Sequence, residues 1–480
     1  MTRDTAELTK EALDDIPLAK TETPEELEDL ALGDDYALNP DYVDMVIDAV
    51  DSGDLKRLRE LVTALEPADV ADLMGFLTAD YREDVIPLLD PEALGEIISE
   101  MDENLREEVL EATPSVTLAR ALEELDTDDA ADVIDDLDET KRFQVLAAMG
   151  ETDRAAIETT LSYEDETAGR LMQREFLAAP EFWTVGQTID HVRDAGDQLP
   201  ELFFDVYVVD PTFKPVGAIP ISILLRSRRE TPLAELMEAA TEIDVGMDQE
   251  EVAYIFDKYH LISAPVIDPG GRLVGQITVD DIVEVIRDEA QEDILALAGV
   301  SDAGRDASVQ EIVRSRLPWL LLNLVTETIA VSAIAIFQDQ IAKLVALAVL
   351  MPIVSSLGGN AGTQTLAVAV RALASKELTA ANARRIIVRE VLVGLMNGVA
   401  LAIVMGLATF LFYHNGRLAI TVGVALIVNI FIAALGGILA PLALEKMGRD
   451  PAVSSSIFVT FLTDFMGFLA VLLIAALLMG

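Results

Sequence analysis

The chain has 480 residues, with 84 Asp and Glu against 34 Lys and Arg, which gives a formal charge of −50. Its hydrophobic content of 51% and mean hydropathy of +0.35 exclude a wholly disordered acidic chain, because such chains contain few apolar residues. The acidity argues against nucleic acid as a partner, because phosphate groups bind to basic surfaces. The absence of Cys excludes disulfides, thiolate metal sites and cysteine nucleophiles.

The charge is distributed unevenly along the chain. Residues 1–316 carry 25 basic and 77 acidic side chains, whereas residues 317–480 carry nine basic and seven acidic ones. An acidic half therefore precedes an apolar half. The N-terminus, MTRDTAELTKEALDD, contains no apolar run, so we expect no cleavable secretory signal. Residues 1–40 are acidic and poor in aromatic residues, and we expect a mobile segment there.

Residues 41–163 show helical periodicity that is broken at short intervals. Helix starts are expected at Pro67, Pro91 and Pro114, because Pro is favoured in the first turn of a helix. Helices this short cannot each bury an apolar face alone. We therefore expect a stacked, superhelical α-helical domain.

Residues 164–298 follow a different, duplicated pattern. Strands are expected at 203–210 and 214–219, and again at 263–268 and 272–278. A helix is expected before and after each pair, which gives two β-α-β-β-α units. The duplication resembles a tandem pair of cystathionine-β-synthase (CBS) domains, an α/β fold.

The most specific part of this resemblance is Gly275-x-x-Thr278-x-x-Asp281. In many CBS domains, the Thr and Asp of this motif hold the ribose of an adenine nucleotide. The first copy reads Gly217-x-x-Pro220 and lacks both residues. The resemblance therefore implies at most one nucleotide site, for ATP, at Thr278 and Asp281.

The segment 299–316 connects the acidic half to the apolar half. We expect its second part to form an amphipathic helix at the membrane surface, where Arg314 and Arg316 suit the anionic inner leaflet. Such a helix would connect the acidic half to the first apolar run.

Residues 317–480 contain five apolar runs, each long enough to cross a bilayer as a helix. Uncharged runs of this length are rare among the buried helices of soluble proteins. Glu327 and Asp464 are the two acids within these runs, and Lys343 is the one base. The runs are 317–337, 341–370, 391–413, 418–444 and 453–480.

The positions of Lys and Arg predict the orientation of these spans. Basic residues cluster before the first span, between the second and third, and between the fourth and fifth, whereas the opposite loops carry only Lys343 and Arg417. We therefore expect a multi-pass protein of the cytoplasmic (inner) membrane. Its N-terminus would be cytosolic and its C-terminus outside.

Asp464 is a carboxylate within the fifth span. An intramembrane carboxylate is costly and normally faces a partner or a water-filled path. Thr460 lies four residues before Asp464 and so shares its helix face, which offers oxygen atoms to a hard, hydrated cation such as Mg²⁺. The alternative is a protonated carboxyl group that is hydrogen-bonded inside the bundle.

The second span contains Pro352 and the sequence Gly358-Gly359-Asn360-Ala361-Gly362. We expect these residues to break the helix, so that freed carbonyl groups and the Asn360 amide face the ion. The alternative is close helix packing through small residues. Glu327 could lie in a water-filled groove or bond another span, and we assign it no role.

The order of these parts resembles the MgtE family of magnesium channels and transporters. Three motifs carry the resemblance, which extends from about residue 54 to the end of the chain. In that family a homodimer forms a Mg²⁺ pore, and the cytosolic half closes the pore when internal Mg²⁺ is high. The motifs are Pro352-x₅-Gly358-Gly359-Asn360-Ala361-Gly362-x-Gln364-Thr365; Thr278-Val279-Asp280-Asp281 with Glu289-Ala290-Gln291-Glu292-Asp293-Ile294; and Asp450-Pro451-Ala452 with Thr463-Asp464.

Cytosolic carboxylates at helical spacing repel one another unless a cation bridges them, which is what a magnesium-dependent switch requires. The alternative is a solvated acidic surface. The chain departs from the family at His260, where an acid is typical, and at Ser456, where Asn is typical. By resemblance, the regulatory ligands are Asp128, Asp132, Asp248, Glu250, Asp257, Asp281, Glu284, Glu289, Glu292, Asp293 and Asp450.

Two other functions compete with this interpretation. A nucleotide-regulated transporter of anions would also carry a CBS pair, but it would need basic residues within the spans. A non-conducting membrane sensor of Mg²⁺ would have no use for Asp464. An enzyme is the weakest interpretation, because His191, His260 and His414 are scattered and form no catalytic or zinc set.

Overall fold

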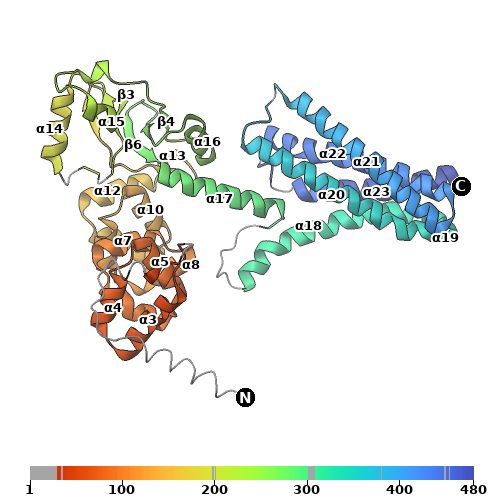
Figure 1. Cartoon of the computed structure of the whole chain (residues 1–480), viewed down its shortest axis with the longest axis horizontal. Helices are drawn as coiled ribbons and strands as arrows, with labels where there is room; N and C mark the ends of the chain where they lie inside the picture. Colours follow the sequence, from red (N-terminus) through yellow and green to blue (C-terminus); the bar gives the residue numbers. More distant parts are fainter. Residues whose placement is uncertain are drawn as a thin grey trace. The chain divides into compact units, whose positions relative to one another are not determined.

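Figure 1 shows the chain as a computed structural model, which divides into two compact units, Met1–Ile282 and Val283–Gly480. The structure describes residues 27, 30–33, 36–196, 199–200, 202–300, 309–379, 381–447, 450–452 and 455–479.

The first unit begins with a succession of short helices, as the sequence predicts. Proline occupies the first position of α3, α5 and α7, where its missing N–H costs nothing. The helices are α3 Pro40–Ser52, α4 Leu55–Val62, α5 Pro67–Phe76, α6 Ala79–Val85, α7 Pro91–Ser99, α8 Glu103–Ala112, α9 Ser115–Leu122, α10 Thr127–Asp135, α11 Glu139–Ala148 and α12 Glu151–Thr160.

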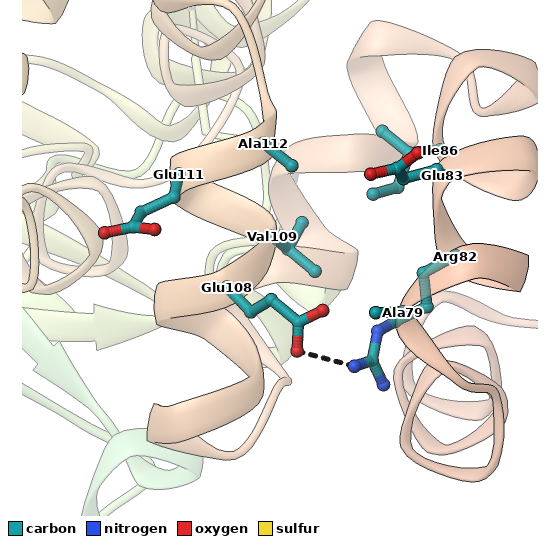
Figure 2. Close-up of a pocket in the computed structure, with 8 residues that line it drawn as sticks. All are labelled: Ala79, Arg82, Glu83, Ile86, Glu108, Val109, Glu111 and Ala112. Atoms are coloured by element: carbon teal, nitrogen blue, oxygen red, sulfur yellow. Dashed lines mark hydrogen bonds and ion pairs between the residues drawn. The ribbon is translucent and has the colours of Figure 1, made fainter.

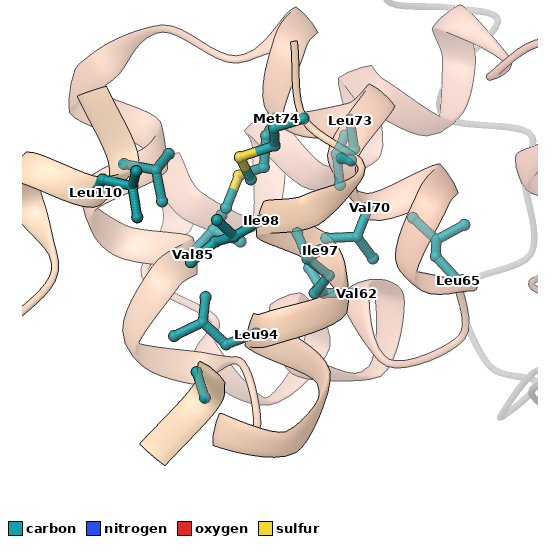
Figure 3. Close-up of a cluster of buried hydrophobic side chains, with 14 of the residues drawn as sticks. Val62, Leu65, Val70, Leu73, Met74, Val85, Leu94, Ile97, Ile98 and Leu110 are labelled. Atoms are coloured by element: carbon teal, nitrogen blue, oxygen red, sulfur yellow. The ribbon is translucent and has the colours of Figure 1, made fainter. Parts of the chain in front are cut away.

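One continuous apolar core runs through these helices. Figure 3 shows its central part, where Leu73 and Met74 of α5 pack beside Ile97 and Ile98 of α7. Because each helix is short, burial against its neighbours supplies most of the stability of the stack. Leu27 and Ala31 are buried in the same core. The mobility expected for residues 1–40 stays a prediction, and residues 1–26, 28, 29, 34 and 35 lie outside the described residues.

A recurring arginine closes the ends of these helices. Arg82 of α6 donates to carbonyl groups at the end of α5, and Arg106 of α8 does the same at the end of α7. Arg142 of α11 donates to the last residue of α10. A guanidinium at a helix C-terminus satisfies free carbonyls and offsets the negative end of the helix dipole. The stack therefore uses one capping device three times.

A hollow of about 290 Å³ opens between α6 and α8, and Figure 2 shows the residues that line it. The Arg82 guanidinium forms an ion pair of 2.6 Å with Glu108 at its edge. None of the predicted site residues lines this hollow. We therefore assign it no part in the candidate site.

The α/β part contains two three-stranded sheets, with orders β1-β2-β3 and β4-β5-β6. In each sheet the first two strands are parallel and the last two are antiparallel, which confirms the predicted duplication. The elements are α13 Ala168–Leu171, β1 Ala178–Pro180, α14 Val185–Ala195, β2 Asp205–Val209, β3 Pro215–Pro220, α15 Ile221–Arg226, β4 Ile243–Asp244, α16 Gln249–Tyr259, β5 Ser263–Ile267, β6 Leu273–Thr278 and α17 Val279–Leu297.

The same turn joins the antiparallel strands in both copies. The Asp210 carboxylate accepts hydrogen bonds from backbone N–H groups in the first turn, and Asp268 does so in the second. Phe213 and Gly271 each adopt a positive φ there, of 64° and 76°. The duplication therefore extends to the geometry of the hairpin.

Among the described residues of the second unit, five helices are long and apolar enough to cross a membrane, as predicted. α22 packs against α20, α21 and α23 at the centre of the bundle. The helices are α18 Val309–Ile336, α19 Gln338–Lys343, α20 Ala346–Ala374, α21 Ala383–Tyr413, α22 Gly416–Lys446 and α23 Ser455–Met479.

The predicted break in the second span is wrong, because α20 is a continuous helix through Pro352 and through residues 358–362. The glycines there allow close packing instead. A Cβ atom at Gly358 would lie 2.0 Å from the Asn429 amide nitrogen, and one at Gly362 would lie 2.5 Å from a methyl group of Val459. The backbone carbonyls of this region stay in the helix ladder and are not freed for an ion.

The second part of the connecting segment 299–316 is helical, as expected, but it is not separate from the first span. Gly299 and Val300 follow the end of α17, and the next described residue, Val309, already begins α18. α18 then runs without interruption into the first span, because no residue between Val309 and Leu317 ends a helix, and Pro318 is accommodated inside it.

Candidate ion pathway and magnesium-sensing sites

The acidic side chain of the fifth span meets polar groups from two other spans. The Ser355 hydroxyl of α20 donates a hydrogen bond to the Asp464 carboxylate of α23. The Glu327 carboxyl of α18 lies within hydrogen-bonding reach of the same Asp464 group. Polar groups in a bilayer are costly unless they meet each other, an ion or water. Glu327, which the sequence left without a role, therefore belongs to the surroundings of Asp464.

A fourth polar residue, Asn429 of α22, lies close to this group. Its side chain is fully buried, and its Nδ2 donates to the carbonyl oxygen of Val354 at 2.9 Å. Its Oδ1 is buried without a hydrogen-bond partner among the described residues. Sequence reasoning missed Ser355 and Asn429. A lone amide inside an otherwise apolar span is the signal that could have identified Asn429.

The other two predicted pore residues, Thr460 and Asn360, lie on the packed pair of helices α20 and α23. The Thr460 hydroxyl donates to the carbonyl oxygen of Ser456 at 2.9 Å, so its lone pairs remain available to an ion or water. Asn360 is exposed in the single chain. The structure therefore joins Asp464 to Ser355 and Glu327, and it leaves the Asn360 amide on an outer face of the bundle.

In the cytosolic unit, Asp128 lies in the first turn of α10 with only 6% of its surface exposed. Its Oδ1 has no hydrogen-bond partner among the described residues. Burial raises the pKa of Asp128 well above its usual range, and the nearby carboxylates of Asp281 and Asp129 add to the shift. A buried carboxylate next to other carboxylates is a position that a divalent cation would stabilise.

Asp281 lies opposite, in the first turn of α17. Burial, followed by the neighbouring Asp280 carboxylate, raises the pKa of Asp281 to about 7. Its Oδ2 accepts hydrogen bonds from the hydroxyl and the backbone N–H of Thr278, at 3.0 and 3.4 Å. The structure thus brings together the two residues of the predicted nucleotide motif. It also places Asp281 beside the predicted regulatory residue Asp128.

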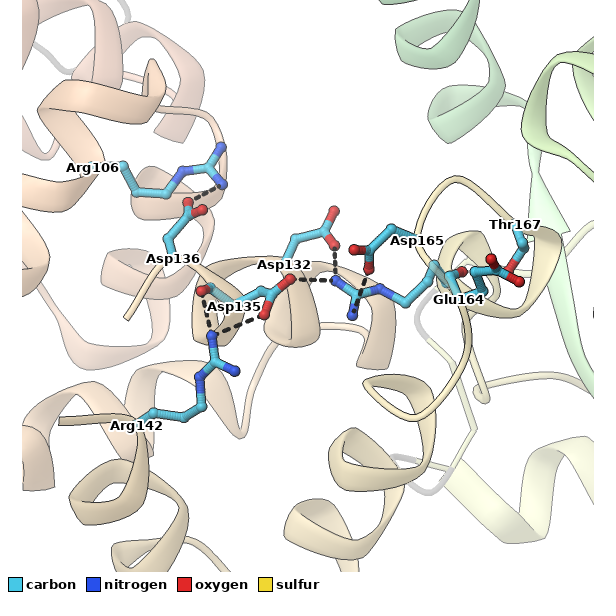
Figure 4. Close-up of polar contacts among 9 residues, drawn as sticks. Arg106, Asp132, Asp135, Asp136, Arg142, Glu164, Asp165 and Thr167 are labelled. Carbon is cyan, nitrogen blue, oxygen red and sulfur yellow. Dashed lines mark hydrogen bonds and ion pairs between the residues drawn. The ribbon is translucent and has the colours of Figure 1, made fainter. Parts of the chain in front are cut away.

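Asp132, the other predicted ligand on α10, is paired with a base. The Arg170 guanidinium, from the segment that precedes β1, forms ion pairs with Asp132 and Asp135, whose carboxylates are labelled in Figure 4. The separations are 3.5 and 3.1 Å. Arg170 was not predicted from the sequence as a functional residue.

The acids of α16 serve its N-terminus or lie at the surface. Asp248 is the N-cap residue, and its carboxylate accepts a hydrogen bond from the backbone N–H of Glu250 at 3.0 Å. Asp257 is exposed. On α17, the exposed Glu284 forms an ion pair of 2.9 Å with Arg287. These four predicted ligands therefore have exposed carboxylates in the single chain.

In the second unit, Asp293 near the end of α17 lies close to Asp450, in the loop before the fifth span. Burial raises the pKa of Asp293, and the carboxylates of Asp450 and Glu289 add to the shift. The Asp450 carboxylate accepts a hydrogen bond from the backbone N–H of Ala452 at 2.7 Å. The end of α17 packs through Ala296 and Leu297 onto a small apolar cluster of the membrane helices, formed by Leu366, Val370, Ala452 and Val459.

Within the part of the chain that the structure describes, no group of three or more His, Asp or Glu side chains is arranged to hold a metal. Two pairs of the predicted ligands are near enough to interact electrostatically: the Asp281 carboxylate raises the pKa of Asp128, and the Asp450 carboxylate raises that of Asp293, in both cases after burial. Mg²⁺ loses water reluctantly and is often bound through one or two carboxylates with several waters retained. Pairs of this kind suit a hydrated ion.

Comparison with known proteins tests the identity of the whole chain. The chain is 33% identical over 439 residues to the magnesium transporter MgtE of Enterococcus faecalis. The match covers 91% of this chain and 96% of that protein. The chain belongs to the MgtE family. A second member, the magnesium transporter MgtE of Thermus thermophilus, is 32% identical to this chain over 443 residues. The match covers 90% of this chain and 97% of that protein.

Family models match separate parts of the chain. Residues 351–474 match the MgtE divalent cation transporter model, residues 65–166 match the MgtE intracellular N domain, and residues 234–288 match a CBS domain. A solved structure, titled as the cytosolic domain of the Mg²⁺ channel MgtE in complex with ATP, is 31% identical and covers 51% of this chain and 99% of its own, with a TM-score of 0.49. The predicted fold class and family are confirmed.

Proposed function

We propose that this chain is a magnesium-selective channel that imports Mg²⁺ across the cytoplasmic membrane and closes when Mg²⁺ binds to its cytosolic domains. Its family and the named function of its relatives support Mg²⁺ as the transported ion. One observation of the structure carries the proposal. Asp464 meets a hydroxyl and a second carboxyl group in the middle of five apolar helices, where its own span contains no basic residue.

The chemistry of this group favours a cation over an anion. Glu327 and Asp464 are the only charged residues of their spans, and both are acidic. A pathway for anions would place basic groups or helix N-termini there. Carboxylate and hydroxyl oxygens are the ligands that Mg²⁺ prefers, and Asp464 could bind the ion through its retained water. Asn360 and Thr460 are the further pore residues of the proposal.

We further propose that the pore forms between two copies of the chain. Asn360 of α20 is exposed in a single chain although it lies within a span. An exposed amide is unfavourable against lipid and favourable against water or a second copy. Two copies of Asp464 around a twofold axis would supply two carboxylates to one hydrated ion. The homodimer also suits the exposed acids of α16 and α17, because a second copy could complete their sites.

Gating in this proposal uses the carboxylate pairs. Without Mg²⁺, Asp128 and Asp281 repel each other to the extent that they are ionised, as do Asp293 and Asp450. With Mg²⁺, each pair gains a bridging cation, so α10 is drawn to the CBS part and α17 to the loop before the fifth span. The ion thereby shifts the balance between two states of the cytosolic half. The other regulatory residues are Asp132, Asp248, Glu250, Asp257, Glu284, Glu289 and Glu292.

ATP is the proposed second ligand, at Thr278 and Asp281. The two side chains are already joined, which presents a carboxylate and a hydroxyl at the start of α17. These are groups that bind a ribose. Direct titration of the full-length chain with labelled ATP would test the site, with Thr278→Val as the variant that removes the hydroxyl.

The pore assignment is tested by Mg²⁺ flux into liposomes that contain the full-length chain. Asp464→Asn preserves the size of the side chain and removes its charge. Asp339→Asn is the matched control, because Asp339 lies in the short helix α19 outside the candidate spans. We expect the first variant to lose nearly all flux and the second to keep it. Equal flux through both would remove Asp464 from the pathway.

A further inference from the structure

The helix α10, which carries two proposed magnesium ligands, is bound at its N-terminus by a residue from outside the helical domain. The Glu175 carboxylate accepts hydrogen bonds from the hydroxyl of Thr127 at 2.6 Å and from its backbone N–H at 3.2 Å. The N-cap residue of α10, Asp126, makes no side-chain capping bond. Glu175 therefore takes the place of the cap, and its negative charge suits the positive end of the helix dipole.

The other end of α10 is bound by Arg170, five residues before Glu175. The Arg170 guanidinium lies 3.5 Å from Asp132, 3.1 Å from Asp135 and 3.5 Å from Asp165. Its side chain is only 11% exposed. A guanidinium this well buried depends on its ion pairs, and a cation near the end of a helix also suits the negative end of the dipole. The guanidinium therefore bridges α10 and the segment containing Asp165.

The segment 165–175 is at the same time part of the α/β fold. Gln173 exchanges two backbone hydrogen bonds of 2.9 Å with Gln276 of β6, and the backbone N–H of Gly169 donates to the Val245 carbonyl at 2.9 Å. Arg170 and Glu175 thus reach α10 from a segment that is fixed to the second CBS unit. The contacts described here between α10 and the α/β part are made by protein side chains.

We propose that Arg170 is a resident counter-cation for α10, which holds this helix to the CBS part in the absence of Mg²⁺ and competes with Mg²⁺ for Asp132. The inference rests on the proposed magnesium regulation, because Asp132 is one of its ligands. If Arg170 acts in this way, the contact between α10 and the CBS part depends only partly on Mg²⁺. The Mg²⁺ concentration needed for closure then also depends on Arg170.

Removing the guanidinium changes the two states in opposite ways. Without Mg²⁺, Asp132 and Asp135 lose their shared cation, so the contact with α10 weakens. With Mg²⁺, the Asp132 carboxylate no longer pairs with a guanidinium, and the local charge is more negative by one. The ion therefore binds more tightly. A residue that only stabilised the fold would weaken the contact equally in both conditions.

Hydrogen exchange of the full-length chain in detergent, with EDTA and across a Mg²⁺ titration, tests the proposal. Arg170→Met keeps much of the side-chain volume without the charge. Arg142→Met is the matched control, because Arg142 also binds Asp135, at 2.8 Å, but from within the helical domain. The readout is the exchange rate of the α10 amides.

We expect Arg170→Met to exchange about tenfold faster than the native chain in EDTA, because it loses the ion pairs that join α10 to the segment 165–175. Mg²⁺ should restore native protection, with a midpoint that is lowered several-fold. The control should show the same loss with and without Mg²⁺. Native exchange of Arg170→Met in EDTA, or a loss that Mg²⁺ does not repair, would overturn the proposal. If Mg²⁺ does not change the exchange of the native chain, the proposed regulation fails. The comparison of Arg170→Met with the native chain in EDTA still tests whether Arg170 holds α10 to the CBS part.

Discussion

Gly358 is the position where one added methyl group should discriminate most sharply between a packed and an open second span. In the structure, a Cβ atom at Gly358 would lie 2.0 Å from Nδ2 and 2.8 Å from Cγ of Asn429. At the next residue, Gly359, the nearest atom to such a Cβ is Oγ1 of Thr463 at 3.8 Å, an ordinary contact. Gly358→Ala and Gly359→Ala therefore make the same chemical change one residue apart, with and without a clash.

The expected cost at Gly358 follows from what must move. Asn429 is fully buried and donates to the carbonyl of Val354, so its displacement leaves polar groups unpaired in an apolar bundle, at about 1–3 kcal/mol. Overpacking adds about 1–3 kcal/mol, and the helix propensity of Ala returns about 1 kcal/mol. We expect a net loss of about 1–5 kcal/mol for Gly358→Ala. Gly359→Ala should be neutral or stabilising by up to about 1 kcal/mol.

The assay is the thermal midpoint of the purified chain in detergent, read by the loss of monodisperse protein, together with Mg²⁺ flux. A double variant, Gly358→Ala with Asn429→Ala, removes the side chain that clashes. The two substitutions should be strongly non-additive, because they act on one contact. Equal midpoints for Gly358→Ala and Gly359→Ala, or full additivity in the double variant, would refute the close packing of α20 on α22.

Two further predictions concern charged groups. The pKa of Asp281 is raised to about 7 from an unfolded value of about 3.9, so the folded chain holds an extra proton in this interval, and the free energy of unfolding without Mg²⁺ should fall as pH rises from about 4 to 7. Asp281→Asn should flatten this slope in denaturant titrations of the full-length chain, and an unchanged slope would count against the assignment. Glu327→Gln should keep the fold but raise the Mg²⁺ concentration for half-maximal flux several-fold, because it removes a carboxylate beside Asp464. The same flux curve for this variant and the native chain would place Glu327 outside the pathway.

The fold was predictable because its signals are local. Apolar runs of about 20 residues indicate spans, since the thickness of the bilayer fixes their length. Prolines in the first turn marked helix starts at Pro67 and Pro91, and the repeated strand pairs indicated the duplicated α/β part. Each of these features depends on residues that are close in sequence.

The errors arose where a residue type has two uses. Glycines at 358–362 are compatible with a broken helix or with a continuous helix that packs closely on its neighbours. The position of Asn429 on another span shows that the helix is closely packed. The start of α18 is a similar case, because a helix at the membrane surface and the beginning of a span have the same local pattern.

The residue types alone indicated the classes of chemistry in this protein: acids without Cys, a carboxylate in the last span, and an Asp in the nucleotide motif. Which of these groups contact each other depends on how the helices pack. Asp464 meets Ser355 from a helix more than 100 residues earlier in the chain, and Arg170 meets α10. The physical reason is that charge and hydrophobicity belong to single residues, whereas hydrogen bonds and ion pairs require two groups that the packing of helices brings within a few ångströms.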